Sequence, residues 1–472
     1  MSTREKIKIT IDGKEVEGYS DETYHTIAKK NGIEIPTICH HPELKPAGKC
    51  RVCVVEQEIG GVSKIIASCK EIAVHNSIIR TDSERIVKTR TALIKKMVKS
   101  HSEECSVCGT GQSCKVKSLE EKYLIDEPVE KEAVEPDIRE NNEFFTFDAS
   151  LCVKCGICVR VTQELQVCNV LNMERGKFDG FPFPNDELSF ESSGCVACGN
   201  CVAACPSGAL SSHHMKQAEY CEELTKTTTV CSYCGVGCNF DILANQDTNT
   251  ISYVDSNLSN VVNGLALCVK GRFGWDFVNH PERLNAPLIK KNGEFVEASW
   301  DEAFDFIEKK LKTIRSESGP GALAFLTSAK CTNEENYLMQ KFARAAIGTN
   351  NVDHCARLCH ASTVAGLARA FGSGAMTNSI DDLTNDAEVI VIIGSNTTEA
   401  HPVIGMKIKQ AVISEKTKLI VADPRKIELV DYSEIHLQHK PGSDVALINA
   451  FMKVILDENL HDEEFIKART EG

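Results

Sequence analysis

The apolar and polar positions near the start of the chain predict a small β-rich domain with one helix. Residues 6–10 and 15–18 alternate in polarity on either side of an Asp-Gly pair, which predicts a β-hairpin because Asp-Gly favours a type I′ turn. A short helix is predicted over 23–31, where the pattern ends at a glycine. Two further strand-like runs follow, at 52–57 and 65–68.

The next amphipathic segment predicts a longer helix, over 83–100. Its apolar residues recur at helical spacing, and we interpret its basic residues as a solvent-facing surface. The apolar residues are Ile86, Leu93, Ile94, Met97 and Val98, and the basic ones are Lys88, Arg90, Lys95, Lys96 and Lys99.

Beyond this helix the pattern changes twice. Residues 126–143 are acidic, contain two prolines and lack periodicity, so we interpret them as a linker. After residue 283, apolar runs alternate with helical stretches, which predicts an α/β domain with a parallel sheet. Buried parallel strands are predicted at 322–327, 389–393 and 419–422, and helices at 332–347, 403–415 and 445–459.

Composition narrows the classes of function. The 472 residues predict three or more domains, and the net charge of −14 argues against a protein that binds nucleic-acid phosphates. The chain has no run of roughly 18 apolar residues, so no membrane span is expected. Residues 1–8 lack the apolar region of a secretory signal, and we expect a cytoplasmic protein. In a reducing compartment, the 23 cysteines, an odd number, indicate metal ligands rather than disulfides.

The first set of candidate ligands suits a [2Fe–2S] centre, whose irons take four thiolates, with zinc as the alternative. It consists of Cys39, Cys50, Cys53 and Cys69. Ten residues separate its first two cysteines, a wider gap than in plant-type ferredoxins. The spacing resembles the ferredoxin-like domain of the large iron–sulfur subunit of respiratory complex I, which implies a β-grasp fold.

The second set combines one imidazole with three thiols. It consists of His101, Cys105, Cys108 and Cys114. Spacing alone leaves a tetrahedral zinc site open. The run also resembles the [4Fe–4S] site of the complex I family that has one histidine and three cysteine ligands, and its place after the first set favours that interpretation.

Two further sets come from a bacterial ferredoxin pattern, in which the last cysteine of each run binds the other cluster. The third set is Cys152, Cys155, Cys158 and Cys205. The other cluster takes Cys195, Cys198 and Cys201, but Thr162 stands where its fourth ligand is expected. We expect Cys168 to replace it if the local helix is rearranged, which gives a fourth set of Cys168, Cys195, Cys198 and Cys201. If Cys168 cannot reach, this centre is incomplete or labile.

The fifth set is Cys231, Cys234, Cys238 and Cys268. With the Val269–Trp275 stretch that follows, it resembles the N-terminal [4Fe–4S] module of molybdenum or tungsten bis-pterin oxidoreductases. In that family a lysine two residues past the final cysteine bridges the cluster and a pterin ring. The resemblance gives this role to Lys270.

Candidate nucleotide-binding loops follow the predicted strands of the α/β domain, where ligands bind beyond the carboxyl ends of parallel strands. Glycines in these loops permit close approach of a ligand, and a helix start can meet phosphate. The chain has neither G-x-G-x-x-G nor a Walker A sequence. The candidate cofactor-binding residues are Gly394, Asn396, His401, Asp423, Arg425, Gly442 and Asp444.

Residues 351–361 contain a Cys359-His360 pair, which offers a soft metal ligand beside a proton acceptor. From 332–336 through this pair to 374–376, and again at 396–402 and 423–426, the sequence closely resembles the cytoplasmic formate dehydrogenases. The resemblance implies that Cys359 binds molybdenum or tungsten and that His360 assists formate oxidation as an acid–base group. No role is assigned to Cys221, Cys331 or Cys355.

The resemblance covers about residues 5–472 and implies the catalytic subunit of a formate dehydrogenase. It implies one [2Fe–2S] and four [4Fe–4S] clusters, with molybdenum or tungsten held by two molybdopterin guanine dinucleotides. Electrons would pass to a flavin-containing, NAD(P)- or ferredoxin-reactive partner docked near residues 1–120, or to a hydrogenase subunit. The choice of metal, the direction of the reaction and the final acceptor stay open.

Three alternatives remain. A nitrate reductase also uses cysteine on the metal, although methionine generally follows that cysteine. The chain could also be a pure electron carrier, like the complex I subunit, or a scaffold for hydrogenase or diaphorase partners. Family members continue beyond this chain with a formate-orienting arginine and a β-barrel domain, so we expect a fragment or a site completed by another polypeptide. Arg357 is not assigned the role of that arginine, and we expect the chain alone not to hold the bis-pterin cofactor stably.

The predicted fold class is a multidomain α+β chain whose α/β body is incomplete. Its predicted parts are a [2Fe–2S] domain at 1–82, the one-histidine module at 83–125, the linker at 126–143, a double [4Fe–4S] ferredoxin domain at 144–222, a further [4Fe–4S] domain at 223–283 and the α/β molybdopterin domain at 284–472.

Overall fold

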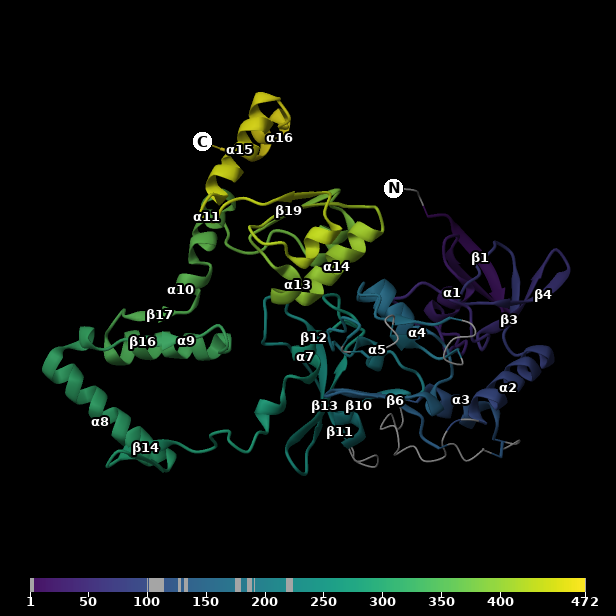
Figure 1. Ribbon diagram of the computed structural model, residues 1–472, viewed down its shortest axis with the longest axis horizontal. Helices are drawn as coiled ribbons and strands as arrows, with labels where there is room; N and C mark the ends of the chain where they lie inside the picture. The colour runs from purple at the N-terminus through teal and green to yellow at the C-terminus, as the bar shows by residue number, and fades with distance from the viewer. Residues whose placement is uncertain are drawn as a thin grey trace. The chain divides into compact units, whose positions relative to one another are not determined.

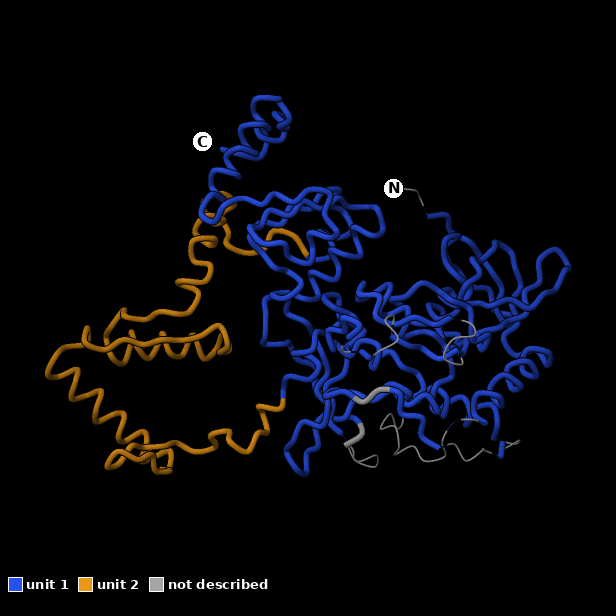
Figure 2. The backbone as a smooth tube through the Cα atoms, in the orientation of Figure 1, with its two compact units in different colours: residues 1–275, 380–472 blue, residues 276–379 orange. Residues whose placement is uncertain are grey.

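The computed structural model divides the chain into two compact units. One unit comprises residues 1–275 and 380–472, and the other comprises 276–379 (Figure 2). The predicted α/β domain at 284–472 therefore contributes to both units. The residues that the structure describes are 4–99, 101, 114–125, 129–130, 135–174, 180–184, 189–190, 192–217 and 224–471.

The first unit begins with a five-stranded sheet of order β2-β1-β5-β3-β4, in which β1 and β5 are parallel and the other pairs antiparallel. The predicted hairpin is confirmed, because Asp12 and Gly13 both have positive φ (48° and 80°), as a type I′ turn requires. Isoleucines of β1, β5 and α1 fill its core. The elements are β1 (Lys6–Ile11), β2 (Lys14–Tyr19), α1 (Tyr24–Lys30), β3 (Val54–Ile59), β4 (Val62–Ala67) and β5 (Ile78–Arg80) (Figure 1).

The predicted basic helix is α2 (Glu84–Val98), followed by α3 (Lys115–Tyr123). The prediction that all of its basic residues face solvent is wrong for Arg90. Arg90 is buried, and its guanidinium donates to the carbonyls of Val52 and Val54 and to the Tyr123 hydroxyl. Arg90 turns inward because strand ends and loops beside α2 leave carbonyl oxygens that need donors.

A small module follows, built on the sheet β10-β7-β6. The end of the segment predicted as a linker, 126–143, contains strand β6. This strand pairs antiparallel with β7. The elements are β6 (Ile138–Asn141), β7 (Phe145–Asp148), η3 (Ala149–Leu151), α4 (Ile157–Arg160), the π-helical turn η4 (Val161–Leu165), β8 (Leu171–Asn172), β9 (Phe183–Pro184), α5 (Asn200–Ala203), β10 (Leu210–Ser212) and α6 (His213–Gln217).

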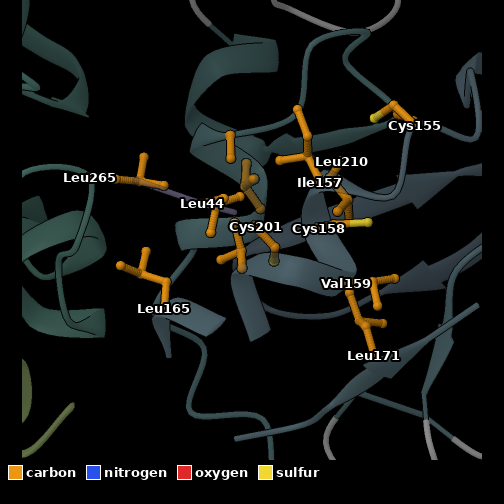
Figure 3. Packing of buried hydrophobic residues seen from close by; sticks show 14 of the residues in the cluster. Leu44, Cys155, Ile157, Cys158, Val159, Leu165, Leu171, Cys201, Leu210 and Leu265 are labelled. Carbon is orange, nitrogen blue, oxygen red and sulfur yellow. The ribbon is translucent and has the colours of Figure 1, made fainter. Parts of the chain in front are cut away.

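The core of this module contains thiols among aliphatic side chains. Figure 3 shows Cys155, Cys158 and Cys201 beside residues such as Ile157 and Leu210. An antiparallel sheet then continues the chain, made of β11 (Leu224–Val230), β12 (Asn239–Asn245) and β13 (Thr250–Ser256), and the short helix α7 (Val269–Phe273) and the turn η6 (Asp276–Val278) follow it.

The last part of the first unit is a parallel sheet, β18-β19-β20, with helices between its strands. This confirms the predicted parallel strands at 389–393 and 419–422. Ile390 and Ile392 are buried, whereas the alternate residues Val389 and Val391 are exposed, so β18 is buried on one face only. The elements are α12 (Ile380–Asn385), β18 (Val389–Ile393), α13 (Thr397–Ala400), α14 (Pro402–Ile413), β19 (Lys418–Ala422), η9 (Glu428–Tyr432), β20 (Ile435–Leu437), α15 (Asp444–Asp457) and α16 (Glu463–Arg469).

The second unit contains a hairpin, a long helix and a short parallel pair. The predicted strand at 322–327 is the shorter β16, which pairs with β17. The predicted helix at 332–347 begins at a capping box of Thr332 and Glu335 and ends in a π-helical turn. The elements are β14 (Leu288–Lys291), β15 (Glu294–Glu297), α8 (Trp300–Ser318), η7 (Pro320–Ala322), β16 (Phe325–Thr327), α9 (Asn333–Lys341), η8 (Phe342–Ile347), β17 (Val352–His354), α10 (Ala356–Cys359) and α11 (Ala361–Phe371).

Among the described helices, none combines the length and apolar character that crossing a membrane requires.

Candidate metal centres

The first set lies together in loops at the edge of the N-terminal sheet. The Cys50 N–H donates to Cys39 Sγ at 3.4 Å, and the Sγ atoms of Cys53 and Cys69 are 3.2 Å apart. The hydrogen bond with Cys53, burial and the nearby Cys39 and Cys50 all raise the pKa of Cys69. The structure therefore brings all four predicted ligands into one site.

Half of the second set can be placed. His101 and Cys114 are both buried, and His101 Nε2 lies 3.9 Å from Cys114 Sγ and 3.3 Å from the Ser207 carbonyl oxygen. Cys105 and Cys108 lie outside the described residues, as does Cys221.

The loop that carries three cysteines of the third set and the loop that carries three cysteines of the fourth have the same backbone conformation. In each loop the residue before the second cysteine and the glycine after it have positive φ, at Lys154 and Gly156 in one and at Ala197 and Gly199 in the other. The Lys154 N–H donates to Cys152 Sγ and the Ala197 N–H to Cys195 Sγ, both at 3.4 Å. In each loop a backbone N–H group thus turns toward a cysteine sulfur, an arrangement that supports anionic ligands.

The thiols of the third set also influence one another. Burial and, after it, the nearby Cys205 together raise the pKa of Cys155 to about 12. Burial and the proximity of Cys155, Cys152 and Cys205 raise the pKa of Cys158. The ligand from the second run, Cys205, therefore lies with the three from the first, as the ferredoxin pattern predicts.

Cys168 lies with the other three cysteines of the fourth set. After burial, the largest causes of the raised pKa of Cys201 are the nearby Cys198, Cys195 and Cys168. Burial is the main cause of the raised pKa of Cys168, and the nearby Cys195 adds to it. The Cys168 thiol therefore lies near the three cysteines for which the ferredoxin pattern lacks a fourth ligand.

A rearranged helix end positions Cys168. The π-helical turn η4 follows α4, and the Thr162 carbonyl accepts from the N–H groups of both Cys168 and Asn169, at 2.9 and 3.0 Å. The Thr162 hydroxyl donates to the Val159 carbonyl and accepts from the Leu171 N–H. Val167 is left-handed, with φ 52°, which is rare for a β-branched residue and typical of functional sites.

The fifth set surrounds the turn between β11 and β12 and the start of α7. Cys231 and Cys238 close the turn through a 2.8 Å backbone hydrogen bond, and Cys268 is the N-cap residue of α7. Burial and, after it, the nearby Cys231, Cys234 and Cys268 together raise the pKa of Cys238 to about 12. All four predicted ligands therefore share one site.

Lys270 lies on α7 with an exposed side chain, and its Nζ is 5.9 Å from the centre of the Tyr233 ring. Tyr233 lies between two cysteines of the fifth set and donates its hydroxyl proton to the Gly274 carbonyl. Lys270 is thus held next to the fifth set with its ammonium group accessible.

The donor sets fit iron–sulfur clusters. Buried thiols with raised pKa values stay protonated unless a cation compensates their charge, and cluster iron supplies that charge. Among the described residues, no three His, Cys, Asp or Glu side chains converge closely enough for a single metal ion. In a cluster the cysteine ligands are distributed over several irons, so they need not converge on one point.

The candidate cofactor loops lie at the carboxyl ends of β18, β19 and β20. Gly394 follows β18 with φ 58°, and its N–H donates to the Ala422 carbonyl at the end of β19. Asp423 is buried and accepts from the Arg425 N–H at 2.8 Å. Asn396 caps α13, and Gly442, with φ 82°, precedes α15, which begins at Asp444.

His401 connects these loops to the fifth set. A Cβ added at Gly235, between two cysteines of that set, would lie 3.5 Å from His401 Nε2. The loops after parallel strands and the turn that carries the fifth set therefore meet, and the polar groups there fit a nucleotide-bearing cofactor.

Cys359 and His360 lie in the second unit, at the end of α10, and both side chains are exposed. Cys355, one turn earlier, accepts from the Ala329 N–H at 3.3 Å and lies 3.7 Å from His354 Nδ1. Cys359 and His360, which are adjacent in sequence, thus belong to the second unit. Lys270 and the sulfur sets belong to the first unit.

Two arginines that the sequence analysis did not single out lie between the sets. Arg160 donates to the carbonyl of Cys39, and Arg272 donates to the carbonyl of Cys198 at 2.9 Å. The sequence could have pointed to them only through their position, a few residues after a ligand cysteine.

Family models match most of the chain. Residues 283–469 match the molybdopterin oxidoreductase model and 224–280 match the molybdopterin oxidoreductase Fe4S4 domain. A 2Fe-2S iron-sulfur cluster binding domain matches at 4–84, and a 4Fe-4S binding domain at 189–211.

Curated relatives are similar over nearly the whole chain. "Probable oxidoreductase YjgC" of Bacillus subtilis is 35% identical, over 99% of this chain and 51% of the relative. "Putative formate dehydrogenase YrhE" of Bacillus subtilis is 34% identical over the same shares, and a Staphylococcus aureus protein of the same description is 32% identical over 98% of this chain and 50% of the relative. The chain spans about half the length of the curated relatives it matches.

Solved structures resemble parts of the chain more weakly. An NAD+-reducing [NiFe]-hydrogenase matches with a TM-score of 0.36 and 21% identity, over 44% of this chain and 87% of that one. Acetylene hydratase from Pelobacter acetylenicus matches with a TM-score of 0.44 and 25% identity, over 52% of this chain and 33% of that one. The sequence matches support a subunit like those of molybdenum or tungsten formate dehydrogenases, with molybdopterin oxidoreductase, [2Fe–2S] and [4Fe–4S] domains.

Proposed function

We propose that this chain carries the electron relay and part of the catalytic body of a molybdenum- or tungsten-dependent formate dehydrogenase. The reaction is formate ⇌ CO2 + H⁺ + 2 e⁻. The observation that carries the proposal is the similarity, over 99% of the chain, to a relative described as a putative formate dehydrogenase. The exposed Cys359-His360 pair supports it, because it offers a metal ligand beside a proton acceptor.

The bound cofactor, two molybdopterin guanine dinucleotides with molybdenum or tungsten, supplies the two-electron redox chemistry. Lys270, beside the fifth set, would contact the pterin. The loops at the carboxyl ends of β18, β19 and β20 would hold the nucleotide parts through Gly394, Asn396, His401, Asp423, Arg425, Gly442 and Asp444. Cys359 would be the metal ligand, and His360 would accept the proton of formate.

The sulfur sets form a series that suits one-electron relay through one [2Fe–2S] and four [4Fe–4S] clusters. Cys268 of the fifth set and Cys198 of the fourth line one cavity of about 240 Å³. Cys201 of the fourth set lies near Cys205 of the third, and Cys155 of the third near Cys39 of the first. Electrons would therefore leave the fifth cluster for the fourth and then the third, and would run from there towards the N-terminal clusters of the second and first sets.

Such a relay needs an acceptor, since two electrons leave each formate. A flavin-containing partner that reacts with NAD(P) or ferredoxin, docked near the first set, completes the reaction in a cytoplasmic complex. A hydrogenase subunit is a second candidate for the same position.

Formate-dependent reduction of a viologen dye by the native complex tests the proposal. We expect activity with formate that Cys359→Ser removes and that His360→Gln lowers at least tenfold, because the first removes a metal ligand and the second a proton acceptor. Cys355→Ser is the matched control, a neighbouring thiol without an assigned role, and is expected to retain the activity.

Two outcomes would contradict this proposal. One is a lack of formate-dependent activity in a complex with full iron and molybdenum or tungsten. The other is an equal loss in Cys355→Ser and Cys359→Ser. Nitrate-dependent oxidation of reduced viologen in place of formate activity would identify the nitrate reductase alternative.

A further inference from the structure

A buried arginine joins the fourth and fifth sulfur sets. Arg272 lies on α7, one turn after Cys268, and is 4% exposed. Its guanidinium donates from Nε to the Cys198 carbonyl at 2.9 Å and from Nη2 to the Asn200 side-chain oxygen at 3.1 Å. It also donates to the Ser256 hydroxyl and the Leu265 carbonyl, at 2.8 and 3.3 Å.

The surroundings of Arg272 are built around its side chain. A Cβ at Gly199, the residue after Cys198, would lie 2.3 Å from Arg272 Cδ, so only glycine leaves room for it. Asn200 is fully buried and also accepts from the Leu267 N–H, in the loop before Cys268. The arginine is therefore fixed to the ligand loops of both sets.

The acceptors of Arg272 are all neutral oxygens, so its charge is not cancelled by a hydrogen-bonded carboxylate. A buried charge in this position is costly unless charges of opposite sign lie nearby. The nearby Asp255 carboxylate favours the charged guanidinium. Thiolate-ligated clusters on both sides would add to that compensation.

A second arginine repeats the arrangement between the third and first sets. Arg160 follows Cys158 by two residues, on α4, and its guanidinium donates to the carbonyls of Cys39 and Lys45. Its Nε is buried without a hydrogen-bond partner among the described residues. Each arginine thus follows a ligand cysteine of one set in the sequence. Its guanidinium donates a hydrogen bond to the backbone carbonyl of a ligand cysteine in the next set.

We propose that Arg272 and Arg160 are positioning residues that bridge successive clusters of the relay. Each fixes the spacing between two ligand loops and places a permanent positive charge between two anionic clusters. Such a charge stabilises the reduced state of both neighbours, so it raises both midpoint potentials. The inference deepens the proposed function and relies on it only for the presence of the clusters.

Redox titration of the native complex, followed by electron paramagnetic resonance without formate, tests this proposal. Arg272→Gln is expected to lower the midpoint potentials of the fourth and fifth clusters and to leave the first unchanged. Arg160→Gln is expected to lower those of the first and third and to leave the fifth unchanged. Arg272→Lys, which keeps a charge but loses the planar fork, is expected to fall between wild type and Arg272→Gln.

Arg90→Gln is the matched control, since Arg90 is equally buried and donates to the carbonyls of Val52 and Val54, which are not in the ligand loops of the third, fourth or fifth set. It is expected to leave the third, fourth and fifth potentials unchanged. If Arg272→Gln loses its iron, Arg272→Lys decides: potentials lowered only at the fourth and fifth clusters support the proposal, and wild-type potentials overturn it.

Unchanged potentials in Arg272→Gln, or an equal shift of every cluster, would overturn the bridging role. The expected pattern in a complex that is inactive with formate would refute the formate dehydrogenase proposal alone. A complex without iron–sulfur signals would refute both.

Discussion

Cys168 is the residue where this chain departs most from the ferredoxin pattern. Thr162 takes the expected ligand position, and its hydroxyl and carbonyl hold the π-helical turn that brings Cys168 toward Cys195, Cys198 and Cys201. Tyr432 donates to the Val167 carbonyl at 3.3 Å and holds the strained loop from the other side. A π-helical turn is often found at a functional site because it re-aims side chains.

Replacing Cys168 tests whether it completes the fourth cluster. Five filled sites predict about 18 irons per chain, so Cys168→Ser is expected to lower the content to about 14, because a cluster with three ligands is labile. Iron analysis of the purified complex measures this. Cys331→Ser, an exposed thiol without a role, is the control and should retain the wild-type iron. Wild-type iron in Cys168→Ser would remove Cys168 from the ligand set.

At this scale, spacing predicted the ligand sets but not the arginines. Cysteine spacing is informative because cluster geometry fixes which thiols can share an iron–sulfur core. Arg90, Arg160 and Arg272 instead find their carbonyl acceptors on loops far away in sequence. No local pattern encodes such partners, so Arg90 was wrongly assigned to the surface.

Elements with a strong local signal formed where the sequence predicts them. The hairpin of β1 and β2, helices α2 and α14, and strands β18 and β19 lie within a few residues of their predicted bounds. Strand β6 was missed because its polar residues gain their pairing only from β7. The π-helical turns η4 and η8 also have no periodic signature in the sequence.

The start of α15 contains a pH-dependent contact between His439 and Asp444, 2.9 Å apart. The hydrogen bond with Asp444 raises the pKa of His439 above 6.5, and the same bond lowers the pKa of Asp444 below 3.8. The stabilisation from His439 is therefore complete below about pH 6.5 and is lost as the pH rises through the folded-state pKa. The stabilisation from Asp444 is lost only as the pH falls through the folded-state pKa of Asp444.

Melting temperatures between pH 5.5 and 8.5 measure this contact. Wild type is expected to lose more stability with rising pH than His439→Gln, whose side chain does not titrate. Asp444→Asn is the companion variant and should flatten the dependence in the same way. Parallel profiles in all three proteins would show that the pair does not stabilise α15.

At the scale of the whole molecule, the packing of the predicted modules could not be read from the sequence. One hydrophobic cluster runs from Ile38 beside the first set through the ferredoxin module to Met406 of α14. Contacts between residues so distant in sequence arise from shape complementarity, which leaves no local pattern. Similarly, the predicted α/β domain contributes to two units because β16 pairs with β17 rather than with β18.

The most direct test of the account is reduction of the clusters by formate alone in the native, metal-loaded complex, followed by rapid-freeze electron paramagnetic resonance. We expect formate to reduce the relay, with signals from the fifth and fourth clusters preceding that of the [2Fe–2S] centre. Clusters that are reduced by dithionite but stay oxidised with formate would contradict it.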